Sequence, residues 1–444
     1  MLSADRRSFR RPRAVIWLAI VVALVVAACG SSETSAPPTP SPSATSETPS
    51  PATSTPSPSA PAQSPSASGD TVAIYDDVEA QVVAIRGLAQ VRPVERQFID
   101  EAELRMLITQ QFDEETPPEY LAAVDRLYKA VGLIPVTSDL RDLYLDLLSG
   151  SVAGFYRNDQ GKLYVVSKTG TPGAVERFFF AHEFDHALQD QNSTIFSDQD
   201  GLKDEGDRIL ARQAIYEGDA TLVMTQWAAA NLDQADILDL LAASSDPEAQ
   251  AVLARTPAIL RDTLTFPYTT GFGYIQAVQA AGGWPAVNAY FADMPESTEQ
   301  IMHPEKYETR EAPVAVALPP KLATRLGEGW SVSLEDTFGE FQMGIWLRET
   351  GVPALDALAA AAGWGGDRLA VVEGPDGAWA VVMQTAWDSA GDATEFEAAA
   401  TTAIKSAGGI ASVLPGSGGN VRWVLIASNA ATLNLVAGSL GLAG

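Results

Sequence analysis

Two histidines and a glutamate have the spacing of a metal-dependent hydrolytic site. Residues 182–186 read HEFDH, so His182 and His186 stand four residues apart and Glu183 follows the first of them. On a helix, positions i and i+4 share one face, so both imidazoles can reach a single Zn²⁺ at about 2.0–2.1 Å. Glu183 can then hold a metal-bound water and take its proton, because the metal lowers the pKa of that water toward neutrality. We therefore expect a zinc-dependent hydrolase with His182 and His186 as ligands and Glu183 as general base.

A catalytic zinc site needs a third protein ligand and keeps a fourth position open. In the elongated HExxH motif a third histidine lies six residues after the second, but that position is Asn192 here and Gln189 replaces the glycine. HEFDH and the later run YEGDA at 216–220 together resemble the gluzincin clan of zinc metallopeptidases, which takes a glutamate from the next helix. The resemblance implies that Glu217 is the third ligand. It also implies that Asp219 orients a ligand histidine through the other ring nitrogen.

The remaining histidine, His303, has a role that the same resemblance suggests. In thermolysin-like enzymes a downstream histidine stabilises the oxyanion opposite the metal. We expect His303 in the active-site cleft in this role, with the phenols between Tyr268 and Tyr274 as alternatives for the same task. Asp185 departs from the common zincin pattern, in which the x positions are uncharged, and we expect it to point away from the metal. The resemblance to uncharacterised bacterial HExxH proteins extends over about residues 78–307.

The periodicity around these motifs predicts the elements that position them. Residues 174–191 predict a long helix that carries HEFDH, and 204–230 predict the helix that carries Glu217. Before them, 152–156 and 162–166 predict a β-hairpin. In zincins an edge strand ahead of the active-site helix binds extended substrate by strand addition, and residues 161–167 stand at the matching place.

The rest of the chain predicts an α+β fold that is predominantly helical. Before Ala312 the helical segments are expected at 101–112, 118–131, 139–148, 233–243, 247–260 and 270–281. After Ala312, helices are expected at 335–350, 353–362 and 394–406 and at the end, with strands at 369–373, 378–385, 410–414 and 421–427. We therefore expect a zincin-like catalytic domain over 71–312 and a C-terminal α+β module over 313–444.

The N-terminus has the pattern of an export signal. Five arginines precede an apolar run at 14–28, which ends in the sequence VAACG with Cys29. About fifteen apolar residues is the length of a signal peptide and falls short of the roughly 20 that a spanning helix needs. The small residues before Cys29 resemble the lipobox of bacterial lipoproteins, which implies a cleaved signal peptide over 1–28 and a lipid on Cys29. The alternative is an uncleaved anchor with an incidental cysteine.

Composition limits the possible partners. Residues 29–70 are rich in Ser, Thr and Pro and cannot bury enough apolar surface to offset the entropy of ordering, so we expect a disordered tether. Without residues 1–28 the chain has 24 basic and 55 acidic residues, a net charge of −31. This charge argues against nucleic acid or an anionic membrane surface as partner. We expect an extracytoplasmic, lipid-anchored zinc metallopeptidase that acts on a peptide or protein substrate. The sequence does not indicate the oligomeric state.

Two other functions stay open at this point. The first is a catalytically inert, lipid-anchored surface or binding protein that keeps zinc as a structural ion. The second is a zinc hydrolase that cleaves a non-peptide bond. A change of Glu183 to glutamine would leave the inert protein functionally unchanged, whereas a broad peptide library that stays uncut would favour the non-peptide hydrolase.

Overall fold

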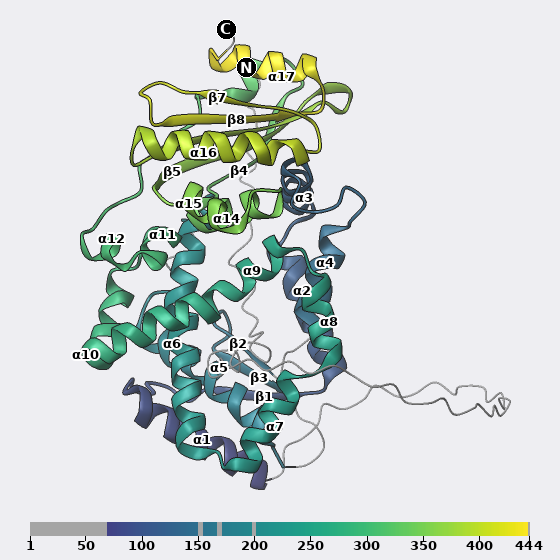
Figure 1. The fold of residues 1–444 in the computed structure, drawn as a ribbon. Coiled ribbons are helices and arrows are strands. Elements are labelled where there is room, and N and C mark those ends of the chain that lie inside the picture. Colours follow the sequence, from purple (N-terminus) through teal and green to yellow (C-terminus); the bar gives the residue numbers. More distant parts are fainter. Residues whose placement is uncertain (1–68, 150–153, 167–170, 198–200, 443–444) are drawn as a thin grey trace, which may run out of the picture.

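The computed structural model describes residues 69–149, 154–166, 171–197 and 201–442. This part of the chain is a mixed α+β fold that is mostly helical and contains two sheets, which confirms the predicted fold class at that level (Figure 1). The predicted signal peptide, Cys29 and nearly all of the predicted tether lie outside the described residues. Among the helices that are described, none has the length and apolar character needed to cross a bilayer.

The N-terminal part consists of helices around a small sheet. The helices are α1 (Gly69–Arg86), α2 (Glu101–Glu115), α3 (Pro118–Val131), α4 (Leu140–Ser149), α5 (Ala174–Asn192), α6 (Gly206–Asn231), α7 (Gln234–Ser244), α8 (Pro247–Arg255), α9 (Ala258–Phe266), the π-helical segment η2 (Pro267–Gly271), α10 (Phe272–Ala292), α11 (Thr298–Met302) and α12 (Pro304–Glu308). The strands are β1 (Glu95–Ile99), β2 (Gly154–Arg157) and β3 (Lys162–Val166). The predicted helix at 247–260 is divided into α8 and α9, which meet at Pro257.

The small sheet contains the predicted hairpin, β2 and β3, and one further strand, β1. Strand β3 lies in the middle, parallel to β1 and antiparallel to β2. The expectation that 161–167 forms an edge strand is therefore wrong for its described residues, and the outer strand that packs against α5 is β2. Strand β1 was not predicted, because three of the five residues in its sequence ERQFI are polar.

The C-terminal part is an antiparallel sheet covered by helices. Its elements are α13 (Leu322–Leu326), β4 (Ser331–Asp336), α14 (Gly339–Glu349), α15 (Ala354–Ala361), β5 (Trp364–Glu373), β6 (Trp379–Trp387), α16 (Ala390–Ala403), β7 (Ile410–Pro415), β8 (Val421–Ala427) and α17 (Ala430–Leu440). The strand order is β4-β5-β6-β8-β7. The helix expected from residue 335 begins later than predicted, because β4 continues to Asp336 and Gly339, with a φ of 72°, makes the turn into α14.

Both faces of this sheet are buried at its central strands β5, β6 and β8, which explains their nearly continuous apolar sequences. Along β5, Leu369 and Val371 point into a core with α14, α15 and α16, whereas Ala370 and Val372 point into a second core with α13 and α17. This alternation is the period of two expected of a strand. The first core also contains residues of α2, α3 and α4, so the C-terminal sheet packs directly on N-terminal helices (Figure 1).

The C-terminal part also holds the start of α6, the helix that carries Glu217. The residue before this helix, Glu205, makes no side-chain cap. Instead, the carboxylate of Asp336 accepts the backbone N–H of Gly206 at 2.6 Å, which satisfies one of the unpaired donors of the helix N-terminus. The next carboxylate, Asp207, accepts the backbone N–H and the hydroxyl of Thr298. The position of α6 therefore depends on contacts with residues about 90 and 130 positions later in the chain.

Candidate metal centre

Helix α5 is enclosed by protein on most sides, as its sequence requires. Residues Phe178–Phe180 and Phe184 pack into one apolar cluster with Tyr75 and Val78 of α1. Helix α6 and strand β2 pack on other sides of α5. A helix that is apolar around most of its circumference is a buried helix. The polar residues of HEFDH must therefore find their partners inside the protein.

The structure brings His182, His186 and Glu217 together. Nε2 of His182 lies 3.1 Å from Oε2 of Glu217 and 3.1 Å from Nε2 of His186. The remaining side, from Nε2 of His186 to Oε2 of Glu217, measures 3.3 Å. We call these three atoms the ligand triangle. The exposed fractions of His182, His186 and Glu217 are only 0%, 5% and 4%.

The ligand triangle has nearly the size that a tetrahedral zinc site requires. Three ligand atoms at about 2.0–2.1 Å from the ion lie about 3.3–3.4 Å from one another when the angles are tetrahedral. Burial raises the pKa of the Glu217 carboxyl, but the two histidines outweigh burial and lower it to about 2, so Glu217 is an anion at neutral pH. Two imidazole nitrogens and one carboxylate oxygen are a donor set that suits zinc. The residues therefore fit the ion in both geometry and charge.

Glu183 does not join the triangle but is held beside it by the small sheet. Its Oε2 accepts the backbone N–H of Tyr156 in β2 at 2.9 Å. Burial raises the pKa of the Glu183 carboxyl to about 8; the His186 charge and the Tyr156 N–H oppose the rise, and the charge of Glu217 adds to it. A carboxyl whose pKa is near the working pH can both accept and return a proton. The outer strand β2 thus positions the residue expected to act as the general base.

Gln189 contacts the far side of the His186 ring. Its Oε1 lies 2.9 Å from Nδ1 of His186. Its amide nitrogen faces three oxygen acceptors: Asp185 Oδ2 at 2.9 Å, the Tyr216 carbonyl at 2.9 Å and Asp219 Oδ2 at 3.1 Å. Because these acceptors need a donor, the amide oxygen must face the imidazole, and His186 donates through Nδ1. Asp219 thus reaches the His186 ring through Gln189, which lies between them.

Sequence reasoning missed two residues of this network, Gln189 and Arg86. Gln189 had a usable signal, since it lies three residues after His186 and so on the same face of α5. Arg86 had none, because it pairs with Asp219 across 133 positions of sequence. Asp185, which we expected to point away from the metal, binds the amide of Gln189 and belongs to the same network.

Tyr268 of η2 is the phenol that the fold brings to the ligand triangle. Its ring centroid lies 6.1 Å from that of His182. Burial raises the pKa of the Tyr268 hydroxyl well above 10, and the charges of Glu217 and Glu183 and a hydrogen bond to Glu217 raise it further. The phenol therefore keeps its proton at neutral pH and can donate it. Tyr274, at the other end of the predicted range, instead pairs with the hydroxyl of Tyr290 at 2.8 Å.

Two glycines let η2 approach α6 closely enough to place Tyr268. A Cβ on Gly218 would lie 2.5 Å from the carbonyl oxygen of Gly271, and a Cβ on Gly271 would lie 2.4 Å from the carbonyl oxygen of Ala214. Both contacts are with backbone atoms, which cannot rotate away. The glycine in YEGDA is therefore a packing requirement of the site, since any larger residue would push η2 off α6.

We expect Gly218→Ala to lower stability by about 1–3 kcal/mol, the usual cost of forcing an extra methyl group into a packed core. Thermal unfolding should show a lower Tm. The matched control is Gly273→Ala in α10, where a new Cβ meets nothing within 4 Å and the higher helix propensity of alanine leaves Tm unchanged or raised. Equal Tm values for the two variants would contradict the close crossing of η2 and α6.

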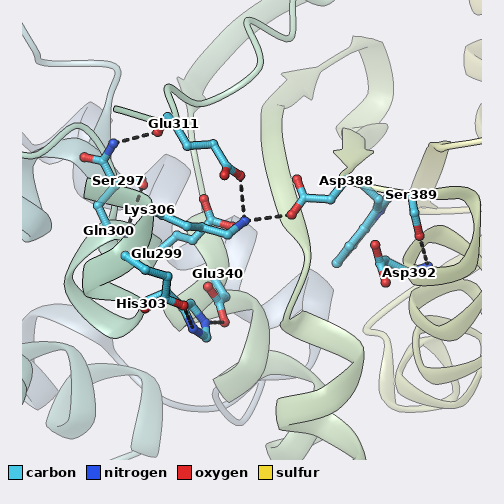
Figure 2. Close-up of polar contacts among 12 residues, drawn as sticks. Ser297, Glu299, Gln300, His303, Lys306, Glu311, Glu340, Asp388, Ser389 and Asp392 are labelled. Carbon is cyan, nitrogen blue, oxygen red and sulfur yellow. Dashed lines mark hydrogen bonds and ion pairs between the residues drawn. The ribbon is translucent and has the colours of Figure 1, made fainter. Parts of the chain in front are cut away.

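His303 is not among the residues that the structure gathers at the ligand triangle. Its Nε2 lies 2.9 Å from Oε1 of Glu340 in α14 (Figure 2). Its Nδ1 lies 3.9 Å from Oε1 of Glu305. The side chain is about a third exposed, at 34%. The predicted oxyanion role of His303 stays a prediction, and the contacts that the structure gives it connect α11 and α12 to α14.

A second acidic group lies near His303 and contacts the ammonium of Lys306. Glu299, Glu311 and Asp388 have oxygens within 4.8 Å of one another. The ammonium of Lys306 lies 2.7, 2.9 and 2.7 Å from these three carboxylates, respectively (Figure 2). This arrangement joins α11 and α12 to the end of β6 through one lysine.

The comparisons with known proteins assign no function to the residues of the ligand triangle. A family described as a domain of unknown function (DUF8575) matches residues 328–435, a region that contains no residue of the ligand triangle. No curated protein matches the chain. Among solved structures, a provisionally assigned hydrolase with a novel fold from Chloroflexus aurantiacus matches at 19% identity, over 54% of this chain and 88% of that chain. Its TM-score is 0.35, too low to support an argument about fold or function.

Proposed function

We propose that this protein is a zinc-dependent peptidase of gluzincin type, in which His182, His186 and Glu217 hold the ion and Glu183 acts as general base. The observation that carries the proposal is the ligand triangle, with sides of 3.1, 3.1 and 3.3 Å. Two helices and a π-helical segment converge there, and a carboxylate that could serve as base lies next to it. When bound, zinc supplies a Lewis acid that acidifies water and polarises a carbonyl group.

The residues around the triangle can perform the proton transfers of peptide hydrolysis. Glu183 takes a proton from the attacking water as the water oxygen bonds to the carbonyl carbon. It then gives this proton to the leaving nitrogen as the C–N bond breaks, so one carboxyl serves both steps. The Tyr156 N–H keeps Glu183 in place during the transfer. Tyr268 can donate a hydrogen bond to the oxygen that becomes negative.

We expect His186→Ala to lose stoichiometric zinc, because it removes one of three donor atoms and leaves two. Elemental analysis of the purified full chain, wild type beside the variant, measures this directly. His303→Ala is the control, since His303 is bonded to Glu340 and lies outside the triangle. One zinc per chain in the wild type and in His186→Ala alike would refute the ligand assignment.

A structural zinc site is the second candidate, and one observation favours it. The three ligand residues are at most 5% exposed, which resembles a closed structural site more than an open catalytic one. The two candidates differ in the need for Glu183, because a structural ion requires no general base. The substitution of this residue discussed below separates them.

The cellular location of the protein is also part of the proposal, and it is inferred from the sequence alone. The lipobox-like run before Cys29 and the Ser/Thr/Pro-rich residues 29–70 favour an extracytoplasmic peptidase on a lipid tether. Mass spectrometry of the mature N-terminus tests this, since a lipidated chain begins at a modified Cys29. An N-terminal peptide that still contains residues 1–28 would contradict it.

A further inference from the structure

The buried ion pair between Arg86 and Asp219 lies two hydrogen bonds away from a ligand histidine. Nε of Arg86 lies 2.9 Å from Oδ1 and 3.1 Å from Oδ2 of Asp219, and both side chains are 0% exposed. Asp219 accepts from Gln189, and Gln189 accepts from His186. The contacts therefore form a continuous path from the last turn of α1 to the ligand triangle.

Arg86 is held for this contact by aromatic residues of α10. The guanidinium carbon lies 4.5 Å from the ring centroid of Trp284 and 5.5 Å from that of Phe291. Stacking on aromatic faces stabilises a guanidinium away from water. The terminal nitrogens Nη1 and Nη2 have no hydrogen-bond partner within the described part of the chain. The polar contact that Arg86 makes is thus directed at Asp219.

Gln189 depends on this ion pair for its orientation. An amide can turn over and exchange its oxygen and nitrogen, which differ little in shape. In the observed orientation the amide nitrogen meets carboxylate oxygens of Asp219 and Asp185, and the amide oxygen meets Nδ1 of His186. Arg86 keeps the Asp219 carboxylate in place as an acceptor, which favours this orientation over the reverse one.

We propose that Arg86 is a positioning residue of the metal centre, which acts through Asp219 and Gln189 to keep the proton of His186 on Nδ1 and so leaves Nε2 for the metal. The inference rests on the proposed function, because it assigns Arg86 a task at a zinc site. Helix α1, which contributes no ligand, is thereby part of that site. Partners of this kind fix the ring nitrogen that binds the ion and typically change metal affinity by 10–100-fold.

The first test measures zinc affinity, with Zn²⁺ alone and a competing chelator, on the full chain. We expect Gln189→Leu to weaken zinc binding by about 10–100-fold and Arg86→Met by about 10-fold. Arg86→Lys keeps the charge but loses the planar guanidinium that stacks on Trp284, so its zinc affinity should fall between those of the wild type and Arg86→Met. The matched control is Arg92→Met, which removes an exposed arginine from its pair with Asp190 of the same helix α5 and should change nothing. If Arg86→Met binds zinc as tightly as the wild type, the inference is overturned.

A double variant shows whether Arg86 acts through Gln189 or only through general stability. If it acts through Gln189, adding Arg86→Met to Gln189→Leu should weaken zinc binding no further, because the path is already broken. Fully additive losses would overturn the inference. If Arg86→Met does not fold, Asp219→Asn replaces it in the same cycle, since it breaks the path while Arg86 stays stacked on Trp284.

A second readout needs no zinc and no activity. The chain has three histidines, so selective ¹⁵N labelling gives few imidazole signals to assign. In the zinc-free wild type we expect a slowly exchanging Nδ1–H signal from His186, which is lost or exchanges at least tenfold faster in Gln189→Leu and Arg86→Met. A wild type with no such signal would overturn the inference. A wild type that shows the signal but takes up no zinc would instead defeat the proposed function and leave the Arg86–His186 path intact.

Discussion

Glu183→Gln is expected to abolish peptide hydrolysis while the protein keeps its zinc. General acid–base catalysis by a positioned side chain contributes about 10²–10⁴-fold, and Glu183 is the carboxyl held beside the ligand triangle. Glutamine has nearly the same shape and can still accept the Tyr156 N–H through its amide oxygen, but it cannot take a proton. The measurement is hydrolysis of a quenched-fluorescence peptide library, with zinc content determined on the same samples.

Loss of the fold would not explain this result. Burial raises the pKa of Glu183 to about 8, which means that the folded protein favours the neutral form of this side chain. Glutamine mimics that neutral form, so in the zinc-free protein the Tm of Glu183→Gln should equal or exceed that of the wild type. The control is Glu176→Gln, the same change two turns earlier on α5, where the carboxylate accepts the Gly173 N–H outside the site.

The alternatives each predict a different pattern. If Glu183→Gln hydrolyses peptides within about twofold of wild type, Glu183 is not the general base. If the wild type binds one zinc per chain but cuts no peptide in the library, the structural site or the non-peptide hydrolase becomes the better proposal. The two remaining options then separate on small ester and amide substrates, which a structural site leaves uncut.

The sequence predicted the parts of the site that local spacing controls. HEFDH lies within one helix, so the meeting of His182 and His186 follows from helical geometry alone. The gluzincin resemblance predicted Glu217 as the third ligand. In the structure its Oε2 lies 3.1 Å from Nε2 of His182 and 3.3 Å from Nε2 of His186. Strands β5, β6, β7 and β8 were also predicted, because the strands at the centre of a sheet buried on both faces have long apolar runs. The edge strand β4 was not predicted, since its sequence SVSLED is largely polar.

The contacts that sequence could not predict join distant segments. Nothing near Arg86 indicates that it will neutralise a carboxylate 133 positions later, and nothing near Asp336 indicates that it caps α6. Strand β2 rather than β3 is the edge strand beside α5 because β1 pairs with the other side of β3, and the polar sequence of β1 concealed that it was a strand. Such contacts depend on tertiary packing, which periodicity does not contain.

The oxyanion stabiliser is the role for which sequence and structure favour different residues. Resemblance favoured His303, whereas the fold gives His303 a bond to Glu340 and brings Tyr268 to the ligand triangle. The Tyr268 hydroxyl already donates toward Glu217 and stays protonated at neutral pH because burial raises its pKa well above 10. It is therefore a donor that needs no proton from solvent when negative charge develops on the substrate.

We expect Tyr268→Phe to lower kcat by about 10²–10³-fold with little change in KM, the usual effect of removing one donor to an oxyanion. Zinc content should stay at the wild-type level, because the phenol is not part of the triangle. His303→Gln is the comparison: glutamine can still donate to Glu340, so kcat should stay within about threefold of wild type. The reverse pattern, with a large loss in His303→Gln and almost none in Tyr268→Phe, would return the role to His303. It would also mean that α11 and α12 move toward the triangle when substrate binds, since in the present arrangement the imidazole of His303 is bonded to α14.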